Sequence, residues 1–284
     1  MATPETIVIL GGGVIGLAIA LELRQRGCAV TVLTRNPDEA AGRAAAGMLA
    51  PQAERLTDAP LFELCRQSRD RYADWIAKIE HLTGLETGYW PSGILTPRYT
   101  QPDRAEQELI HVQSRHSPAY WLDAQAIQAH QPGLSPEVVG GWWFPEDAQV
   151  DNRRLMQTLT TAVQNLGVEL RTGVTVQSLH QQQGRVQGVR TTAGDMQADH
   201  YVLAAGAWAG DLLPVAIAPC KGQMARVAVP ATAPMPRQVL FGDDIYVVPR
   251  QDGQIVLGAT VEAVGFQPGT TPQGLHQLFA AALR

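Results

Sequence analysis

A glycine-rich turn near the amino terminus constrains the fold more than any other feature of the chain. Residues 11–16 read GGGVIG and fit the pattern G-x-G-x-x-G. The turn follows an apolar segment, 7–10, and opens a segment, 14–26, in which apolar residues recur at helical spacing. A second run of β-branched and apolar residues at 29–33 completes a strand–helix–strand unit. This order predicts an α/β domain with a parallel sheet, whose first turn binds a dinucleotide.

Each glycine of the pattern has a physical purpose in such a unit. Gly11 permits the tight turn, Gly13 lets the backbone approach a pyrophosphate, and Gly16 lets the helix pack closely on the strand. The N–H groups of Val14 and Ile15 lie at the positive end of the helix, where they favour a phosphate. The turn therefore predicts a pyrophosphate site.

The end of the second strand leaves the identity of the nucleotide open. An NAD enzyme favours an acidic residue there, but the chain has Thr34 followed by Arg35. Arg35 is compatible with the extra phosphate of NADP. FAD is equally compatible, because a threonine hydroxyl can hold the ribose while the guanidinium lies over the adenine face.

Two later segments favour FAD. RAAAGMLAP at 43–51 has little side-chain volume, as expected where backbone lies against a broad flat ring. VLAAGAWAG at 202–210 returns a buried strand and a glycine to the nucleotide late in the chain. A simple NAD domain does not need that late return.

Composition excludes several classes of function. The chain has 45% hydrophobic and 17% charged residues and a net charge of −5, which predicts a globular protein without a nucleic-acid or membrane partner. No apolar run reaches the roughly 18 residues of a membrane span. The histidines are scattered, so no metal site is expected, and no G-x-S-x-G hydrolase motif occurs. Cys28, Cys65 and Cys220 are expected to be buried thiols in a reducing cytoplasm.

Periodicity places further elements along the chain. Alternation with a period of two after residue 173 predicts an antiparallel meander. Helices are expected at 60–82, 102–116, 123–130, 151–166 and from about 271, and strands at 89–97, 138–144, 174–181, 185–192, 196–198, 200–204, 220–229, 244–249 and 254–260.

The chain also resembles a known family along most of its length. The matching words are VILGGGVIGLAIALEL, AAAGMLAP, GYWPSGIL, VDNRRLM, VLAAGAWA, KGQ and IYVVPRQDGQIVLGAT. They resemble the FAD-dependent amine and amino acid oxidases of the D-amino acid oxidase type, and among these the glycine oxidases of the thiamine pathway. The words run from the amino terminus to about Thr260.

The resemblance implies a set of FAD-binding residues. They would hold the pyrophosphate, the adenosine and the flavin ring, or close over the bound nucleotide. These residues are Gly11, Gly13, Val14, Ile15, Gly16, Thr34, Arg35, Gly42, Arg43, Ala45, Ala46, Gly47, Met48, Leu49, Val174 (through its backbone), Ala205, Gly206 and Trp208. The family commonly has an acidic residue at position 34, so Thr34 is a departure. Losing a charged acceptor weakens ribose binding by on the order of 1–3 kcal/mol.

The implied reaction is hydride transfer from an amine to flavin. The resulting imine hydrolyses to glyoxylate or another carbonyl product and ammonia, and dioxygen becomes hydrogen peroxide. No catalytic acid or base is assigned. Tyr246, Met48 and Arg250 are the expected substrate contacts. Their alternative interpretations are a sheet aromatic for Tyr246, plain packing for Met48 and a solvated surface side chain for Arg250.

The resemblance also implies the domain layout. An α/β Rossmann-like FAD-binding domain is expected at 1–85 and 145–218. An α+β substrate domain, built on an antiparallel sheet, is expected at 86–144 and 219–284. The family's main carboxylate-binding arginine lies in a segment that would follow Arg284, so this domain is expected to be C-terminally incomplete. The partners are a small amino acid or amine and dioxygen, and a homo-oligomer is left open. Sarcosine, proline or D-amino acid oxidation, and an inactive FAD-binding protein, remain alternatives.

Overall fold

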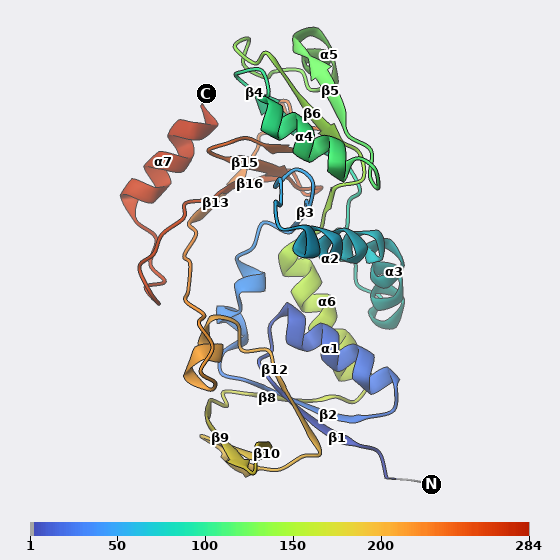
Figure 1. Ribbon diagram of the computed structural model, residues 1–284, viewed down its shortest axis with the longest axis vertical. Helices are drawn as coiled ribbons and strands as arrows, with labels where there is room; N and C mark the ends of the chain where they lie inside the picture. The colour runs from blue at the N-terminus through green and yellow to red at the C-terminus, as the bar shows by residue number, and fades with distance from the viewer. Residues whose placement is uncertain (1–2, 284) are drawn as a thin grey trace. The chain divides into compact units, whose positions relative to one another are not determined.

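The computed structural model describes residues 3–283, and the chain forms two compact units (Figure 1). Unit 1 holds the residues up to Ala45 together with Ala77–Thr87 and Asn152–Pro219. Unit 2 holds Ala46–Ile76, Gly88–Asp151 and the residues from Cys220 onward. The expected FAD-binding domain included residues 46–76 and 145–151, which the structure groups with unit 2. Which residues bind FAD stays a prediction.

Unit 1 is built on a parallel four-stranded sheet in the order β12-β1-β2-β8. Its strands are β1 (Thr6–Leu10), β2 (Ala29–Thr34), β8 (Glu169–Thr172) and β12 (His200–Leu203). Two helices, α1 (Val14–Gln25) and α6 (Asn152–Asn165), lie side by side over one face of this sheet (Figure 1). The expected Rossmann-like sheet is therefore confirmed, although β8 was not expected as one of its strands.

A three-stranded antiparallel meander, in the order β11-β10-β9, covers the other face of the sheet. Its strands are β9 (Val176–Gln182), β10 (Arg185–Thr191) and β11 (Gly194–Met196). Buried Val189 of the meander shares a core with Val8, Leu10 and Leu33 of the sheet. The alternation with a period of two thus predicted this part of the fold correctly.

Unit 2 is built on a seven-stranded sheet in the order β13-β16-β15-β14-β4-β6-β5. These strands are β4 (Ile94–Arg98), β5 (Tyr120–Asp123), β6 (Gly140–Phe144), β13 (Met224–Ala228), β14 (Val239–Phe241), β15 (Tyr246–Pro249) and β16 (Gln254–Gly258). All neighbouring strands are antiparallel except β14 and β4, which pair in parallel. The expected antiparallel sheet is confirmed with that one exception, and β5 and β14 were not expected.

The remaining elements are short. The helices are α2 (Ala59–Asp70), α3 (Tyr72–Thr83), α4 (Arg104–Gln113), α5 (Ala124–His130) and α7 (Pro272–Ala282). Two-residue strands β3 (Met48–Leu49) and β7 (Ala148–Gln149) pair with each other, and 3₁₀ turns occur at η1 (Pro37–Glu39), η2 (Ala41–Arg43) and η3 (Gly206–Asp211). Several helix starts are capped by side chains; Asp58, for example, accepts from the Leu61 N–H at 2.8 Å.

The single helix expected at 60–82 is wrong, because the chain breaks at Arg71. The Arg71 N–H donates to the Ser68 carbonyl at 3.2 Å, which closes a tight last turn of α2. Its own carbonyl then accepts from the Trp75 N–H at 3.1 Å and begins α3. The apolar spacing continues across this single residue, so periodicity alone could not locate the break.

Within residues 3–283, every helix is too short or too polar to cross a lipid bilayer.

Candidate functional site

The glycine turn of unit 1 is shaped by very close backbone contacts. Gly11 has φ +123 and donates its N–H to the Leu33 carbonyl at 2.9 Å. A Cβ at Gly11 would lie 2.2 Å from the Ala204 carbonyl oxygen, and one at Gly16 would lie 1.9 Å from the Gly11 carbonyl oxygen. No side chain fits at either position, so the tight turn and the close helix–strand packing predicted from the sequence are present.

Gly13 differs from these glycines because it faces open space. A Cβ built there would meet no atom within 4 Å. Gly13 is also the N-cap of α1, no side chain caps the helix, and its first turn has no acidic residue. The uncapped N–H groups and the positive end of the helix therefore face free volume, which suits a pyrophosphate.

The late strand β12 returns the chain to this turn. It pairs in parallel with β1, and the Ala204 N–H donates to the Leu10 carbonyl at 2.9 Å. Ala205 and Gly206 follow at the start of η3, beside the glycine turn. Residues 11–16 and 205–206, far apart in the sequence, thus meet at the carboxyl ends of β1 and β12, where α/β sheets bind ligands.

The residues expected around the adenosine lie at the end of β2. Thr34 is buried, and its side chain borders Gly12, where an added Cβ would lie 2.8 Å from the Thr34 Cβ. The Val174 N–H donates to the Thr34 carbonyl at 3.2 Å, and a contact of the Val174 backbone with adenine stays a prediction.

Arg35 has contacts that the sequence did not suggest. Its guanidinium lies 4.5 Å from the centre of the Trp208 ring and pairs with Glu39 at 2.8 Å. The Arg35 hydrogen bond lowers the pKa of Glu39. These contacts bring together two predicted FAD-binding residues, Arg35 and Trp208, and a contact of Arg35 with adenine stays a prediction.

The predicted flavin-binding stretch 42–49 divides between the two units. In unit 1, the Asn152 amide donates to the Gly42 carbonyl at 2.9 Å, and a Cβ at Gly42 would lie 2.9 Å from the Met156 sulfur. The Arg43 Nε donates to the Pro37 carbonyl at 3.1 Å. Gly42, Arg43 and Ala45 therefore border α6 and the loop after β2 in the same unit as the glycine turn.

The second half of the stretch, Ala46 to Leu49, belongs to unit 2. The Gly47 carbonyl accepts from the Val150 N–H at 2.8 Å, and Met48 and Leu49 pair with the strand β7. Met48 also packs against the main apolar core of the unit, which agrees with plain packing. A contact of Met48 with flavin or substrate stays a prediction.

Arg250 is buried, so the interpretation as a solvated surface residue is wrong. Its Nη1 donates to the Gln149 side chain and to the Val150 carbonyl, both at 3.0 Å, and its Nη2 donates to the Ala46 carbonyl at 2.6 Å. The guanidinium thus joins Ala46, in the middle of the predicted flavin-binding stretch, to Gln149 of β7 and to Val150. That it also binds a substrate stays a prediction.

Tyr246 opens β15 and is half-buried. Its ring stacks on Phe241 with centroids 6.3 Å apart, and a Cβ at Gly258 would lie 2.4 Å from its hydroxyl. Burial, and then the charge of Glu54, raise the pKa of Tyr246 to about 12. The phenol therefore keeps its proton at neutral pH and can donate a hydrogen bond.

Glu54 was not predicted as a site residue, since nothing in the sequence near it indicates a role. Its side chain is exposed, yet its surroundings remove enough water from the carboxylate to raise its pKa. Its negative charge opposes deprotonation of the Tyr246 phenol.

A buried ion pair holds the segment between Leu49 and Glu54. Arg69 and Asp147 are both buried, and the Arg69 Nη1 donates to Asp147 at 2.9 Å. The second Asp147 oxygen accepts from the Ala53 N–H at 2.9 Å. Burial raises the pKa of Asp147 to about 7, against the opposing effects of the Ala53 hydrogen bond and the Arg69 charge.

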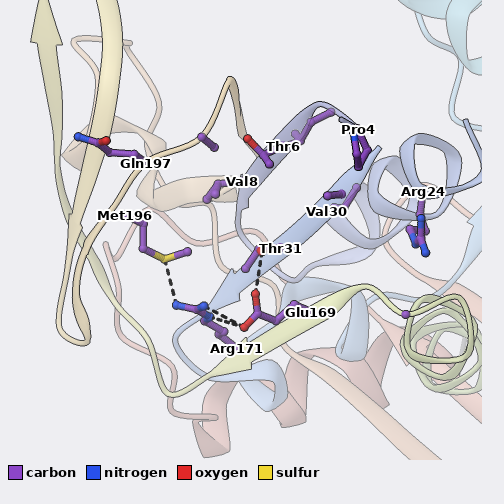
Figure 2. Close-up of a pocket in the computed structure, with 14 residues that line it drawn as sticks. Pro4, Thr6, Val8, Arg24, Val30, Thr31, Glu169, Arg171, Met196 and Gln197 are labelled. Carbon is purple, nitrogen blue, oxygen red and sulfur yellow. Dashed lines mark hydrogen bonds and ion pairs between the residues drawn. The ribbon is translucent and has the colours of Figure 1, made fainter. Parts of the chain in front are cut away.

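A cavity of about 500 Å³ lies elsewhere in unit 1 (Figure 2). It is lined by residues near the amino ends of the strands, such as Thr6, Ala29 and Glu169. Its charged side chains already have partners: Arg171 donates to Glu169 at 2.9 Å, and Arg24 donates to the Leu166 carbonyl at 2.8 Å. Because ligands of α/β sheets bind at the carboxyl ends of the strands, this cavity is not the nucleotide site. Across residues 3–283, no three His, Cys, Asp or Glu side chains gather as metal ligands would.

The chain is similar in sequence, along nearly its whole length, to curated proteins. The chain is 55% identical over 282 residues to the bifunctional protein ThiO/ThiG of Trichormus variabilis, covering 98% of the chain and 43% of that relative. It is 30% identical over 285 residues to the glycine oxidase of Pseudomonas aeruginosa, covering 98% of the chain and 77% of the relative. The chain thus spans less than half the length of the ThiO/ThiG relative.

A solved structure shows the same fold. The crystal structure of glycine oxidase from Geobacillus kaustophilus superimposes with a TM-score of 0.88 at 27% identity, covering 98% of this chain and 77% of that one. The profile of the DAO family, whose description is FAD dependent oxidoreductase, matches residues 6–284. The chain therefore belongs to the DAO family of FAD dependent oxidoreductases.

Proposed function

We propose that the protein oxidises glycine, or another small amino acid or amine, with FAD bound at the carboxyl ends of β1, β2 and β12. FAD is the cofactor of the family. The observation that carries the proposed site is Gly13, which opens to free space at the uncapped start of α1 beside the returning strand β12. The substrate class is supported by the likeness to proteins named glycine oxidase and ThiO/ThiG.

The chain's own groups would hold FAD mostly through backbone and shape. Residues 11–16 would bind the pyrophosphate through N–H groups at the start of α1, and Ala205 and Gly206 would cover it. Thr34 would offer a hydroxyl to the adenosine ribose, and residues 42–49 would lie along the pyrophosphate and the ring. When bound, FAD supplies the chemistry: it accepts a hydride from the carbon next to the amine and passes the electrons to dioxygen, which gives hydrogen peroxide.

Tyr246 would orient the substrate. Its phenol is protonated below a pKa of about 12, so it would donate a hydrogen bond to a substrate carboxylate and would not act as a base. No side chain needs to take a proton from carbon. The imine product would hydrolyse in water to glyoxylate and ammonia when glycine is the substrate.

The likeness to ThiO/ThiG proteins supports a role in thiamine biosynthesis. Three free thiols support a reducing cytoplasm as the location. The expectation that all three are buried is wrong, because Cys28 and Cys65 are only half-buried and Cys220 is exposed.

One experiment tests both cofactor and reaction. The absorbance spectrum of the purified protein is recorded, and glycine is then added without oxygen. Bleaching of the flavin band, followed by peroxide release on admitting oxygen, is the expected result. Bleaching by sarcosine, proline or a D-amino acid but not by glycine would show that the protein oxidises another substrate of the family. A yellow protein that no amine bleaches would indicate an inactive flavoprotein, and failure to bind added FAD would overturn the site.

A further inference from the structure

Four charged side chains of unit 2 form a network around the turn that precedes Tyr246. Arg98 of β4 donates to Glu106 of α4 at 2.8 Å and also to Asp243, which lies in the turn between β14 and β15. Arg55 reaches the same two carboxylates, at 3.0 Å from Asp243 and 3.7 Å from Glu106. Each arginine therefore meets both acids, and the four charges balance.

The network is strongest at its inner end. The side chains of Arg98 and Glu106 are 14% and 9% exposed, so solvent screens this pair weakly. Asp243, at 57%, is more exposed and lies at the outer end. An isolated exposed ion pair contributes little, but a network of several charges with a buried centre holds its members in place.

The backbone conformation of Arg55 separately indicates that its surroundings hold this segment in place. It has φ +50, a left-handed conformation that non-glycine residues rarely adopt. Such a residue persists only where its surroundings hold it, and residues of this kind cluster at functional sites. Arg55 directly follows Glu54, whose charge acts on the Tyr246 phenol. The network thus connects the turn before Tyr246 to the segment that carries Glu54.

We propose that Arg55, Arg98, Glu106 and Asp243 are positioning residues, which hold the turn before Tyr246, and with it the Tyr246 phenol, in place and so set the affinity for the substrate. The proposal rests on the proposed function, because it takes Tyr246 as the substrate contact. None of the four residues takes part in chemistry. Their role is to keep one hydrogen-bond donor in a single position in the absence of substrate, so that binding does not need to order it.

The first test compares charge removals on one helix. Glu106→Gln breaks the network. Glu108→Gln, two residues further along α4, also removes one negative charge, but from an exposed pair with Arg104 that lies outside the network. In the FAD-loaded protein, Glu106→Gln should raise the KM for glycine about tenfold with little change in kcat, since small displacements of positioning groups carry large kinetic costs. FAD affinity should stay near that of the control, whereas the melting temperature should fall, because Glu106 is 9% exposed and pairs with two arginines.

The outer end of the network supplies a second variant for which folding is not in doubt. Asp243→Asn removes the charge from an exposed side chain, and Asp243→Glu retains it. Asp243→Asn should raise KM severalfold, and Asp243→Glu should restore it. A loss of FAD binding and kcat together with KM would indicate a general structural role and would overturn the proposal.

A measurement that does not need activity separates this proposal from the proposed function. The protein has six tyrosines, and fluorine NMR of fluorotyrosine-labelled protein gives a signal for each, with Tyr246→Phe assigning one of them. That signal should shift or broaden in Glu106→Gln and Asp243→Asn but not in Glu108→Gln. An unaltered protein that oxidises no amine would refute the proposed function alone. A Tyr246 signal that is the same in all variants would refute the positioning role.

Discussion

Replacing Gly13 by alanine should abolish tight FAD binding while leaving the fold intact. An added Cβ at Gly13 meets no protein atom within 4 Å, and the φ of −78 suits any residue. The cost to the apoprotein is the change of an N-cap from glycine to alanine, on the order of 1 kcal/mol. For a protein of this size that shifts the melting temperature by about 2–4 °C.

The same methyl group would stand where a pyrophosphate must approach the start of α1. Loss of one charge-assisted hydrogen bond from that site costs about 1.5–3 kcal/mol. The dissociation constant for FAD should therefore rise by roughly ten- to a hundredfold. The assay is a titration of apoprotein with FAD, followed by quenching of flavin fluorescence, together with a thermal melt followed by circular dichroism.

Gly11→Ala is the matched control, because it should destabilise the fold itself, whereas Gly13→Ala should leave the fold intact and weaken FAD binding. There the Cβ would lie 2.2 Å from the Ala204 carbonyl, and φ is +123, so we expect destabilisation on the order of 3 kcal/mol before any ligand is added. If Gly13→Ala binds FAD as tightly as the unaltered protein, the pyrophosphate does not lie over Gly13 and the proposed site is wrong.

Four further results are expected. Tyr246→Phe should raise the KM for glycine and leave FAD affinity unchanged; an unaltered KM in steady-state assays would exclude the phenol as a substrate contact. Arg250→Lys should lower the free energy of unfolding by on the order of 2 kcal/mol in denaturant titrations, because one ammonium cannot reach the Ala46 and Val150 carbonyls and Gln149 together. An unchanged denaturation midpoint would contradict this. Thr34→Glu should tighten FAD binding by about 1–3 kcal/mol in the same fluorescence titration, and weaker binding would show that the ribose is not held there. Asp147 has a folded pKa of about 7, above its ordinary 3.8, so the stability that its protonated form contributes is present below pH 3.8 and is lost as pH rises to about 7. Over this range the free energy of unfolding should fall with pH, and Asp147→Asn should flatten that slope. An equal slope in both proteins would contradict the raised pKa.

The nucleotide-binding half of the molecule could be predicted from sequence because its signals are local. The strand 6–10, the glycine turn and the helix 14–25 each depend on neighbouring residues, and three glycines at these offsets are typical of a nucleotide-binding turn. The sequence VLAAGAWAG also predicted a late strand, which the structure shows as β12, although its pairing with β1 was not predicted. At Gly11, which has φ +123, residue type and backbone conformation agree.

The missed features depend on contacts between distant residues. Arg250 follows a proline near a turn, as many exposed arginines do, and only the carbonyls of Ala46 and Val150 explain its burial. The strands β14 and β4 pair in parallel although 140 or more residues of chain lie between them, which no local pattern encodes. The break at Arg71 likewise depends on tertiary packing rather than on local preference.

The pairing of β1 with β12 has a consequence for synthesis of the protein in the cell. β1 is complete at Leu10, but its neighbour on one side is not made until His200–Leu203. At roughly 5–20 residues per second, the ribosome leaves that edge unpaired for on the order of 10–40 seconds. During this interval an apolar strand, TIVIL, offers open backbone groups to any other nascent chain. We therefore expect molecular chaperones to protect this edge during translation, and the yield of native protein to depend on how quickly elongation reaches β12.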